Sequence, residues 1–215
     1  MNRLPIVEQD NYEVALKLVR DKWEKLDPAL QAKHCGAGFS MDGDTFVITL
    51  PFFGQLIKAT HPAGNLHNAA TDKEPSIWEQ ILILHYLASD SPVLDSDKII
   101  AFSEIPDGKF YHAAYQKRTR NYLLDVFGAS MDTLKEAAVA AGAELEDKGD
   151  ISFYLKAFPK VNVHFVCWRG DEEFEPEASV LWEESVQGFL DIESIAVLGG
   201  MAVGHLARIS RELKG

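Results

Sequence analysis

The sequence contains only two cysteines, Cys35 and Cys167, and they lie far apart. They form no CxxC pair, so no group of cysteines is available to hold zinc or an iron–sulfur cluster. Two isolated cysteines are typical of free thiols in a reducing cytoplasm. We therefore expect a cytoplasmic protein without a metal centre.

Long apolar segments are also missing. The first residues contain no apolar stretch of signal-peptide length. The longest apolar runs, Ile81–Leu87 and Ile195–Val203, fall short of the roughly 18 residues that a membrane-spanning helix needs. The expectation is a protein with no membrane association.

Positive charge is scarce. The sequence has 21 Lys and Arg against 33 Asp and Glu, a formal net charge of −12. Proteins that bind nucleic acids are normally basic, so we expect no nucleic-acid partner. The motifs GxGxxG, Walker A, HExxH and GxSxG are absent as well, and no motif identifies a cofactor. These absences weigh against the commonest nucleotide-binding and hydrolytic enzymes.

The composition is that of an ordinary globular protein, with 215 residues, 47% of them hydrophobic and 25% charged. A chain of this length buries enough apolar surface to fold without disulfides. Periodicity and capping residues predict helices over Asn11–Leu26 (begun by Asp10 and ended at Asp27-Pro28), Pro75–Ala88, Phe110–Phe127 (broken near Thr119), Ser130–Ala141, Glu184–Leu190 and Asp191–Leu213. Strands are predicted over Thr45–Leu50, Gln55–Thr60, Lys98–Phe102, Ile151–Phe158, Val161–Trp168 and Ala178–Trp182.

These strands and helices are grouped along the chain and do not alternate strictly. Grouping of this kind favours the α+β class with an antiparallel sheet over a doubly wound parallel sheet. We therefore expect one α+β domain over residues 1–215, with a central, mainly antiparallel sheet packed by helices.

Five segments carry a family resemblance. Ile81–Leu87 is similar to an "LLHYL" helix, and Phe102–Tyr111 resembles the pattern F-x-E-L-P-x-G-x-F-Y, which Tyr115–Arg118 follows. Phe158–Val161 and Trp168–Phe174 resemble "FP-x-V" and "W-x-GDEEF" strands. Together they resemble the bacterial and archaeal domain-of-unknown-function family 3786.

The resemblance extends over most of the chain, from Tyr12 to Leu198. It implies a cytoplasmic protein of anaerobes, and some members of the family carry an added cysteine-rich iron–sulfur segment that suggests corrinoid or one-carbon redox settings. This chain lacks such a segment, and the family supplies no established activity. The resemblance therefore marks positions along the chain and assigns them no roles.

One basic run stands out in this acidic sequence. Lys117 and Arg118 lie close to Arg120 and Lys109. In a helix, the side chains that share a face with Arg118 are Tyr111, Tyr115 and Tyr122. An arginine beside tyrosine rings can hold a carboxylate or phosphate while a ring stacks on the ligand. The alternative is a solvated helix face that pairs with acidic residues.

Histidines supply the other candidate binding residues. Alternation along its strand puts His164 on the same face as Asn162, and His112 is close to the basic run. His61 and His67 share a loop and form a weak zinc candidate, whereas His85 fits a hydrogen-bonded core histidine. The candidate binding residues are Tyr111, His112, Tyr115, Lys117, Arg118, His164 and Trp168.

From Gly170 to Ala207 the sequence has no Lys or Arg but nine acidic residues. Carboxylates in a hairpin turn can serve as general acid and base, and the candidates here are Asp171, Glu172 and Glu173. The same run also fits a charged tip that keeps a sheet edge from pairing, or a docking face for a basic partner.

The leading hypothesis from sequence is a cytoplasmic accessory protein of anaerobic metabolism that binds an anionic or tetrapyrrole-like ligand or cofactor. One alternative is a hydrolase or isomerase that uses the acidic residues at 171–173. The other is a protein-interaction module with an acidic docking face.

Overall fold

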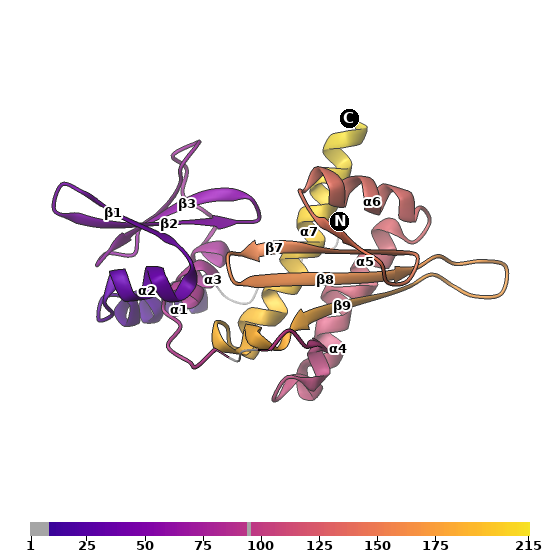
Figure 1. The fold of residues 1–215 in the computed structure, drawn as a ribbon, viewed down its shortest axis with the longest axis horizontal. Helices are drawn as coiled ribbons and strands as arrows, with labels where there is room; N and C mark the ends of the chain where they lie inside the picture. Colours follow the sequence, from indigo (N-terminus) through magenta and orange to yellow (C-terminus); the bar gives the residue numbers. More distant parts are fainter. Residues whose placement is uncertain (1–8, 94–95) are drawn as a thin grey trace. The chain divides into compact units, whose positions relative to one another are not determined.

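The computed structural model describes residues 9–93 and 96–215, and the chain divides into two compact units, Met1–Asp90 and Ser91–Gly215 (Figure 1). We call them unit 1 and unit 2 and describe each by itself. The prediction that residues 1–215 form a single domain stays a prediction.

Unit 1 combines an antiparallel meander with three helices. The strands are β1 (Gly38–Asp42), β2 (Thr45–Phe52), β3 (Gln55–His61) and β4 (Leu66–Asn68), in the order β1-β2-β3-β4. The helices are α1 (Gln9–Trp23), α2 (Pro28–Cys35) and α3 (Ile77–Leu87). The strands predicted over Thr45–Leu50 and Gln55–Thr60 are confirmed, because β2 and β3 include them and pair with each other.

The core of unit 1 lies between this sheet and the helices, where α2 packs on β1 and β2 and α1 packs on α3. Alternate residues of β2, among them Ile48 and Leu50, are fully buried. Trp23 at the end of α1 is also fully buried, and its Nε1 donates a hydrogen bond to the Thr60 carbonyl at 3.1 Å. Gly64 has a φ of 66°, and a Cβ at this position would lie 3.2 Å from the Trp23 ring. Only glycine therefore fits both the backbone and the space here.

Asp27 begins a helix and does not end one. The prediction that Asp27-Pro28 ends the first helix is therefore wrong. Its Oδ1 accepts hydrogen bonds from the amides of Ala29 and Leu30 at 2.9 and 3.0 Å, and Pro28 occupies the first turn of α2. These are the properties of a helix N-cap followed by proline. The predicted cap Asp10 is wrong as well, because α1 already includes Gln9.

α3 is buried along most of its length, as its apolar sequence predicts. Ser76 and Glu79 form a reciprocal capping box at its start. Near its end, the Tyr86 hydroxyl donates to the Cys35 carbonyl at 2.6 Å, which ties α3 to α2. His85 is half-buried on this helix.

Unit 2 is built on a five-stranded antiparallel sheet. Its strands are β5 (Ile99–Ala101), β6 (Glu144–Glu146), β7 (Ile151–Phe158), β8 (Val161–Trp168) and β9 (Glu177–Glu183), in the order β5-β9-β8-β7-β6. The helices are α4 (Gly108–Arg118), α5 (Arg120–Phe127), α6 (Met131–Ala140) and α7 (Ile192–Lys214). Two short 3₁₀ helices, η1 (Phe102–Glu104) and η2 (Glu184–Gly188), complete the unit.

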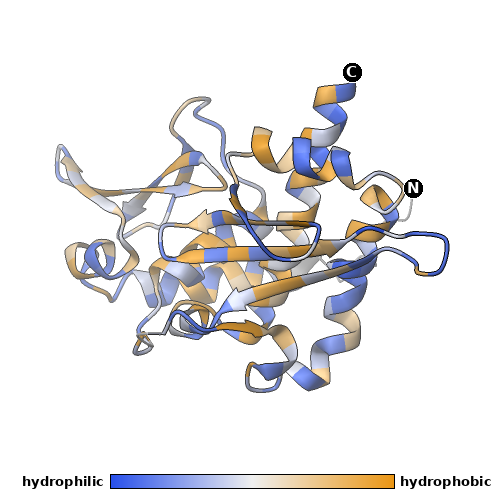
Figure 2. Ribbon diagram, turned by 45° about the vertical axis from the view of Figure 1, so that its right-hand side comes forward, coloured by the Kyte–Doolittle hydropathy of each residue, from blue (hydrophilic) through white to orange (hydrophobic). Residues whose placement is uncertain are grey.

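The helices of unit 2 pack on one face of this sheet. Strand residues that point toward them, including Phe153, Val163, Phe165 and Trp182, are fully buried. Figure 2 shows the apolar stretches of β7 and β8 running through the unit. The predicted helix break is confirmed at Thr119, whose φ of −113° and ψ of −90° separate α4 from α5.

Among the described residues, α7 alone is long and apolar enough to cross a membrane by length and composition. Half of its apolar window is buried inside the fold, as expected for a core helix of unit 2, so the feature is weak evidence for a membrane span.

The α+β class is confirmed, since both sheets are antiparallel and both have helices packed on them. The sequence did not predict α2, β1, β4 or β6. Each is short, with three to eight residues, and too short to show a clear period.

Candidate functional site

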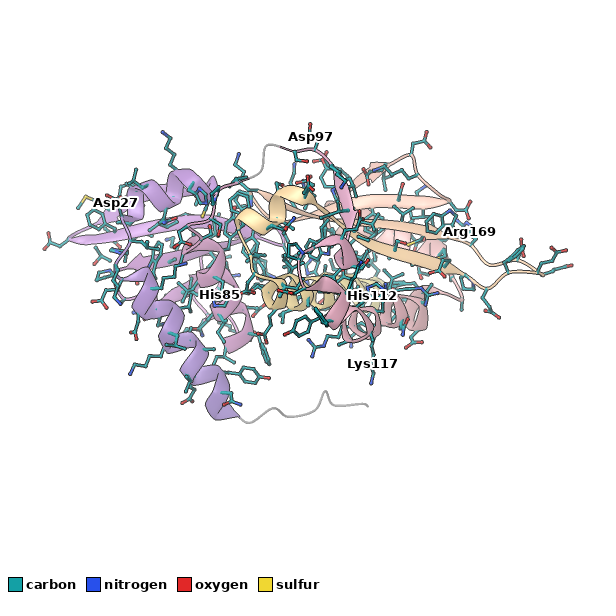
Figure 3. The ribbon with its side chains drawn as sticks, turned by 90° about the horizontal axis from the view of Figure 1, so that it is seen from below. Asp27, His85, Asp97, His112, Lys117 and Arg169 are labelled. Carbon is teal, nitrogen blue, oxygen red and sulfur yellow. The ribbon has the colours of Figure 1, made fainter. Side chains whose placement is uncertain are left out.

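The outward side of α4 carries exposed aromatic and cationic side chains. Phe110 is 88% exposed and Tyr111 is 53% exposed. Lys109, Lys117 and Arg118 are exposed too, and Figure 3 shows Lys117 pointing away from the fold. We call these five residues the α4 basic surface.

Helical spacing arranges this surface in two rows. Phe110 and Lys117 are seven residues apart, and so are Tyr111 and Arg118, which puts each pair on one line along the helix about 10 Å apart. The exposed Ala113 and Ala114 lie between the two ends. The surface therefore offers aromatic rings at one end, a small apolar floor, and cations at the other end.

The cations of the α4 basic surface are unpaired within the described part of the chain. Of the arginines described, Arg118 alone has neither a hydrogen bond nor an ion pair from its side chain. The other five described arginines all have a hydrogen bond or an ion pair from the side chain, namely Arg20, Arg120, Arg169, Arg208 and Arg211. The predicted pairing of the basic run with acidic residues applies to Arg120, which binds Glu177, and not to Arg118.

Tyr115 lies on the inward side of α4 and is not available to a ligand. It is 2% exposed, and its ring stacks on Phe102 with centroids 3.9 Å apart. Its hydroxyl donates to the Val180 carbonyl at 3.1 Å and accepts from Trp182 Nε1 at 2.8 Å. Burial raises the pKa of Tyr115 well above its usual value. The residue is part of the core of unit 2.

His112 lies half-buried on α4, between the inward and outward sides. Its Nε2 is 3.4 Å from Gln116 Nε2, and its Nδ1 is buried without a hydrogen-bond partner. It therefore borders the α4 basic surface and does not extend it outward.

The structure does not bring His164 together with Arg118 and His112. On β9, Trp182 and Val180 are on the side that contacts Tyr115 of α4. His164 pairs in register with Leu181, which alternation places on the opposite side of the sheet. The predicted three-residue anion site is therefore divided between two faces of unit 2.

His164 has two carboxylate neighbours on its own face of the sheet. Its Nδ1 is 3.1 Å from Glu146 Oε2, and its Nε2 is 3.5 Å from Glu183 Oε1. Asn162 donates to the same Glu183 oxygen at 2.8 Å, and Lys148 pairs with Glu146 at 2.9 Å. We call these five residues the His164 network. The histidine side chain is only 6% exposed, so it is a buried part of the fold.

Opposing effects act on the protonation of this network. Burial alone would lower the pKa of His164, but hydrogen bonding and charge attraction from Glu183 and Glu146 outweigh it and raise the pKa above 6.5. The hydrogen bond from His164 lowers the pKa of Glu183. Burial works to raise the pKa of Glu146, but Lys148 and His164 together lower it. The arrangement therefore favours an imidazolium between two carboxylates, held by a hydrogen bond between Nδ1 and Glu146 and by charge attraction to Glu183.

Trp168 is 40% exposed at the end of β8, away from α4. The structure thus leaves the seven predicted binding residues in five places: the outward side of α4, its half-buried border at His112, its inward side, the opposite face of the sheet, and the end of β8. Three of the seven remain together as an exposed set, namely Tyr111, Lys117 and Arg118.

The predicted catalytic residues lie at the tip of the β8–β9 hairpin. Asp171, Glu172 and Glu173 are all exposed, and Figure 2 shows this hairpin as largely hydrophilic. The amides of Glu173 and Phe174 donate to Asp171 Oδ1, both at 2.8 Å, and lower the pKa of Asp171. A general acid at neutral pH needs a raised pKa in a cleft, so this geometry gives no support to acid–base chemistry at the tip.

The structure brings no metal-binding group together in the described ranges, 9–93 and 96–215. His61 shares a face of β3 with the buried Ala59, whereas His67 pairs beside Lys58 on the other face. The two histidines of the zinc candidate are therefore on opposite sides of the unit 1 sheet.

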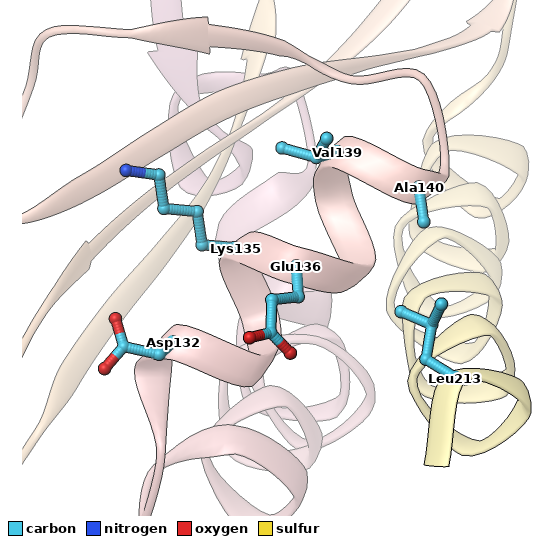
Figure 4. A pocket seen from close by; sticks show the side chains of 6 residues that line it. All are labelled: Asp132, Lys135, Glu136, Val139, Ala140 and Leu213. Atoms are coloured by element: carbon cyan, nitrogen blue, oxygen red, sulfur yellow. The ribbon is translucent and has the colours of Figure 1, made fainter. Parts of the chain in front are cut away.

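A surface pocket of about 710 Å³ lies between α6 and the end of α7 (Figure 4). Its walls are charged on one side and apolar on the other, with Asp132, Lys135, Glu136, Val139, Ala140 and Leu213 lining it. Arg169 binds Asp132 at 2.6 Å at its rim. No residue predicted from sequence lies in this pocket.

Sequence reasoning missed both carboxylates of the His164 network. Glu183 could have been found, because it directly follows a predicted strand and falls on the His164 face by alternation. Glu146 could not, because β6 was not predicted. Phe110 was missed as well, although its position four residues before Ala114 and seven before Lys117 places it on the cationic side of the helix.

The chain was compared with protein-family models, with curated proteins and with solved structures, and a family model matches. No curated protein and no solved structure matches the chain. A family model described as a domain of unknown function, DUF3786, matches residues 27–205, which include the α4 basic surface, the His164 network and the acidic hairpin. The chain therefore belongs to the DUF3786 family.

Proposed function

We propose that this chain is a binding accessory protein whose α4 basic surface holds an anionic group of a partner molecule. The observation that supports this most directly is that Lys117 and Arg118, beside exposed aromatic rings, have no partner among residues 9–93 and 96–215, in a chain of net charge −12. An acidic chain has many carboxylates with which to neutralise a structural arginine, and it does so at Arg120 and Arg169.

The geometry of the surface defines the ligand class. Arg118 can form a bidentate pair with a carboxylate or phosphate, and Lys117 adds a second positive charge. Phe110 and Tyr111 can cover an apolar group about 10 Å away along the helix. The best fit is a ligand or peptide segment that carries an anionic group at one end and an apolar group at the other.

A tetrapyrrole-like ligand fits this surface less well than a smaller anion. Ligands with large flat rings normally bind in concave sites that cover most of their area. The α4 basic surface is the outward side of one helix and offers rings on one side only. A role in the cytoplasm of anaerobes belongs to the same proposal and is supported by the family resemblance alone.

The test is binding of a fluorescein-labelled peptide that has one phenylalanine followed, three residues on, by two glutamates. Fluorescence anisotropy should show saturable binding that weakens as salt is added, because the charges involved are exposed. The double variant Lys117→Ala/Arg118→Ala should bind at least tenfold more weakly, since loss of two charge-assisted contacts corresponds to roughly 1.4 kcal/mol or more. Inorganic pyrophosphate should compete with the peptide for the wild-type protein.

Arg208→Ala is the matched control. It removes one exposed arginine that is paired with Glu212 on α7, and it should leave peptide binding unchanged. The double variant should melt within about 2 °C of the wild type, because exposed side chains contribute little to stability. Equal weakening by Arg208→Ala, or unchanged binding by the double variant, would contradict the proposal.

A further inference from the structure

β1 is an edge strand that is open to solvent on both faces. All five of its residues, Gly38–Asp42, are exposed, and among the described strands it pairs with β2 alone. The other edge strands of the two sheets, β4, β5 and β6, have three residues each. β1 is thus the longest edge in the described structure.

The sequence of β1 lacks the devices that normally protect an edge. Edge strands are kept from pairing by short length, by charged side chains, by proline or by bulges. β1 has no proline, no cation and no bulge, and its only charged residue is Asp42 at the turn. The exposed side chains of Phe39 and Met41 are apolar, at 43% and 60% exposure. β6, by contrast, is short and carries Glu144 and Glu146.

The register shows which backbone groups of β1 are free. Asp42 pairs with Thr45 and closes a two-residue hairpin, so these two residues exchange backbone hydrogen bonds. Antiparallel pairs alternate between bonded and non-bonded, which directs the N–H and C=O groups of Ser40 toward β2 and those of Phe39 and Met41 outward. The free edge therefore presents two donors and two acceptors.

We propose that β1 pairs with β1 of a second copy of this chain, antiparallel about a two-fold axis at Ser40, and joins two four-stranded sheets into one of eight strands. Only a pairing centred on Ser40 uses all five residues of both strands. Phe39 of each copy then lies opposite Met41 of the other copy. The two outward N–H groups and two outward C=O groups of each edge all find a hydrogen-bond partner. The interface does not rest on the α4 basic surface, which lies in the other unit.

The side chains of β1 suit pairing with β1 of a second copy better than pairing with a strand of a different protein. Phe39 and Met41 are on the same face of β1, at equal distances from the axis, so an apolar residue meets an apolar residue at both positions. Asp42 comes opposite the partner's Gly38, and no carboxylate meets another. The Phe39 ring already stacks on Phe46 of β2, with centroids 5.6 Å apart, which holds it in place for contact across the new pair.

Cysteine cross-linking tests the axis directly. In the proposed pairing, Ser40 meets the partner's Ser40 in a non-hydrogen-bonded pair with Cα atoms about 4.5 Å apart, within the range that a disulfide spans. Ser40→Cys should therefore form a disulfide-linked dimer rapidly under mild oxidation. Asp44→Cys is the matched control, since two copies of this turn residue would lie roughly 20 Å apart along the strand direction. Cys35 and Cys167 are buried and do not compete.

A charge at the edge tests the association without cross-linking. Sedimentation equilibrium of the full chain should show a monomer–dimer equilibrium, and Met41→Lys should raise its dissociation constant at least tenfold, whereas Met41→Leu should not. Circular dichroism checks that Met41→Lys is folded. A protein that is monomeric at all concentrations, or that cross-links through Ser40→Cys no faster than through Asp44→Cys, overturns the proposal. So does a dimer that Met41→Lys leaves unchanged.

Discussion

Two glycines on the same helix should respond to alanine in opposite ways. Gly199 and Gly204 both lie within α7, where alanine is favoured over glycine by about 1 kcal/mol. A Cβ at Gly204 would meet nothing within 4 Å. We therefore expect Gly204→Ala to raise the free energy of unfolding by about 0.5–1 kcal/mol.

At Gly199 the same methyl group meets a filled core. Its Cβ would lie 3.0 Å from both Tyr115 Cε2 and Thr119 Cγ2, and 3.3 Å from the Trp182 ring. The tyrosine cannot shift easily, because Phe102 stacks on it and its hydroxyl is hydrogen-bonded at two sites. Overpacking of this kind costs roughly 1–3 kcal/mol, so the gain in helix propensity is cancelled or reversed.

The difference between the two variants isolates the packing contribution, since both gain the same helix propensity. Gly199→Ala should be less stable than Gly204→Ala by about 1–3 kcal/mol. Urea unfolding followed by circular dichroism measures this, and both residues belong to unit 2 and report on the same packed helix. Equal stability of the two variants, or a more stable Gly199→Ala, would refute the packing argument.

Two further predictions concern titratable groups. The pKa of His164 is raised in the folded state, so the stabilisation it supplies is complete below its ordinary pKa of 6.5 and is lost as pH rises through the raised pKa. The pKa of Glu183 is lowered, so the stabilisation it supplies is complete above its ordinary pKa of 4.5 and is lost as pH falls through the lowered pKa. His164→Gln should therefore lose most stability relative to wild type between pH 4.5 and 6.5 in urea unfolding, and a loss that is independent of pH would contradict this. Burial raises the pKa of both Cys35 and Cys167 to about 12, so neither thiol should react with a disulfide reagent at pH 8 until denaturant is added. Rapid reaction of either thiol in the native protein would show that its site opens.

The sequence was most informative where one element has a single clear period. The strands Ile151–Phe158 and Val161–Trp168 form with the predicted bounds, because each alternates between a buried face and a partly polar one and Pro159-Lys160 separates them. The break at Thr119 was also predictable. α2 was not, because its eight residues begin with a proline, Pro28, that equally fits the end of α1.

The candidate site could be predicted only in part, for a physical reason. Helical spacing correctly groups Tyr111 with Arg118, but it also groups them with Tyr115, which the packing of α4 against the rest of unit 2 buries. Spacing describes an isolated helix and does not say which side meets the sheet. For His164 the reverse holds: alternation gave the correct face of β8, but nothing in the sequence shows on which face α4 packs.

The proposal that α4 binds a ligand depends on separating the cations that have a structural partner from those that have none among the described residues. Arg120 joins α5 to Glu177 of β9, and Arg169 joins the end of β8 to Asp132 of α6. Lys117 and Arg118 have a structural explanation too, because cations in the last turn of a helix are favoured by its dipole. That explanation does not extend to Phe110, which is near the start of the same helix and is 88% exposed. An exposed aromatic ring costs solubility and adds nothing to the helix dipole, so the ring and the cations together support the proposal of a ligand that contacts both.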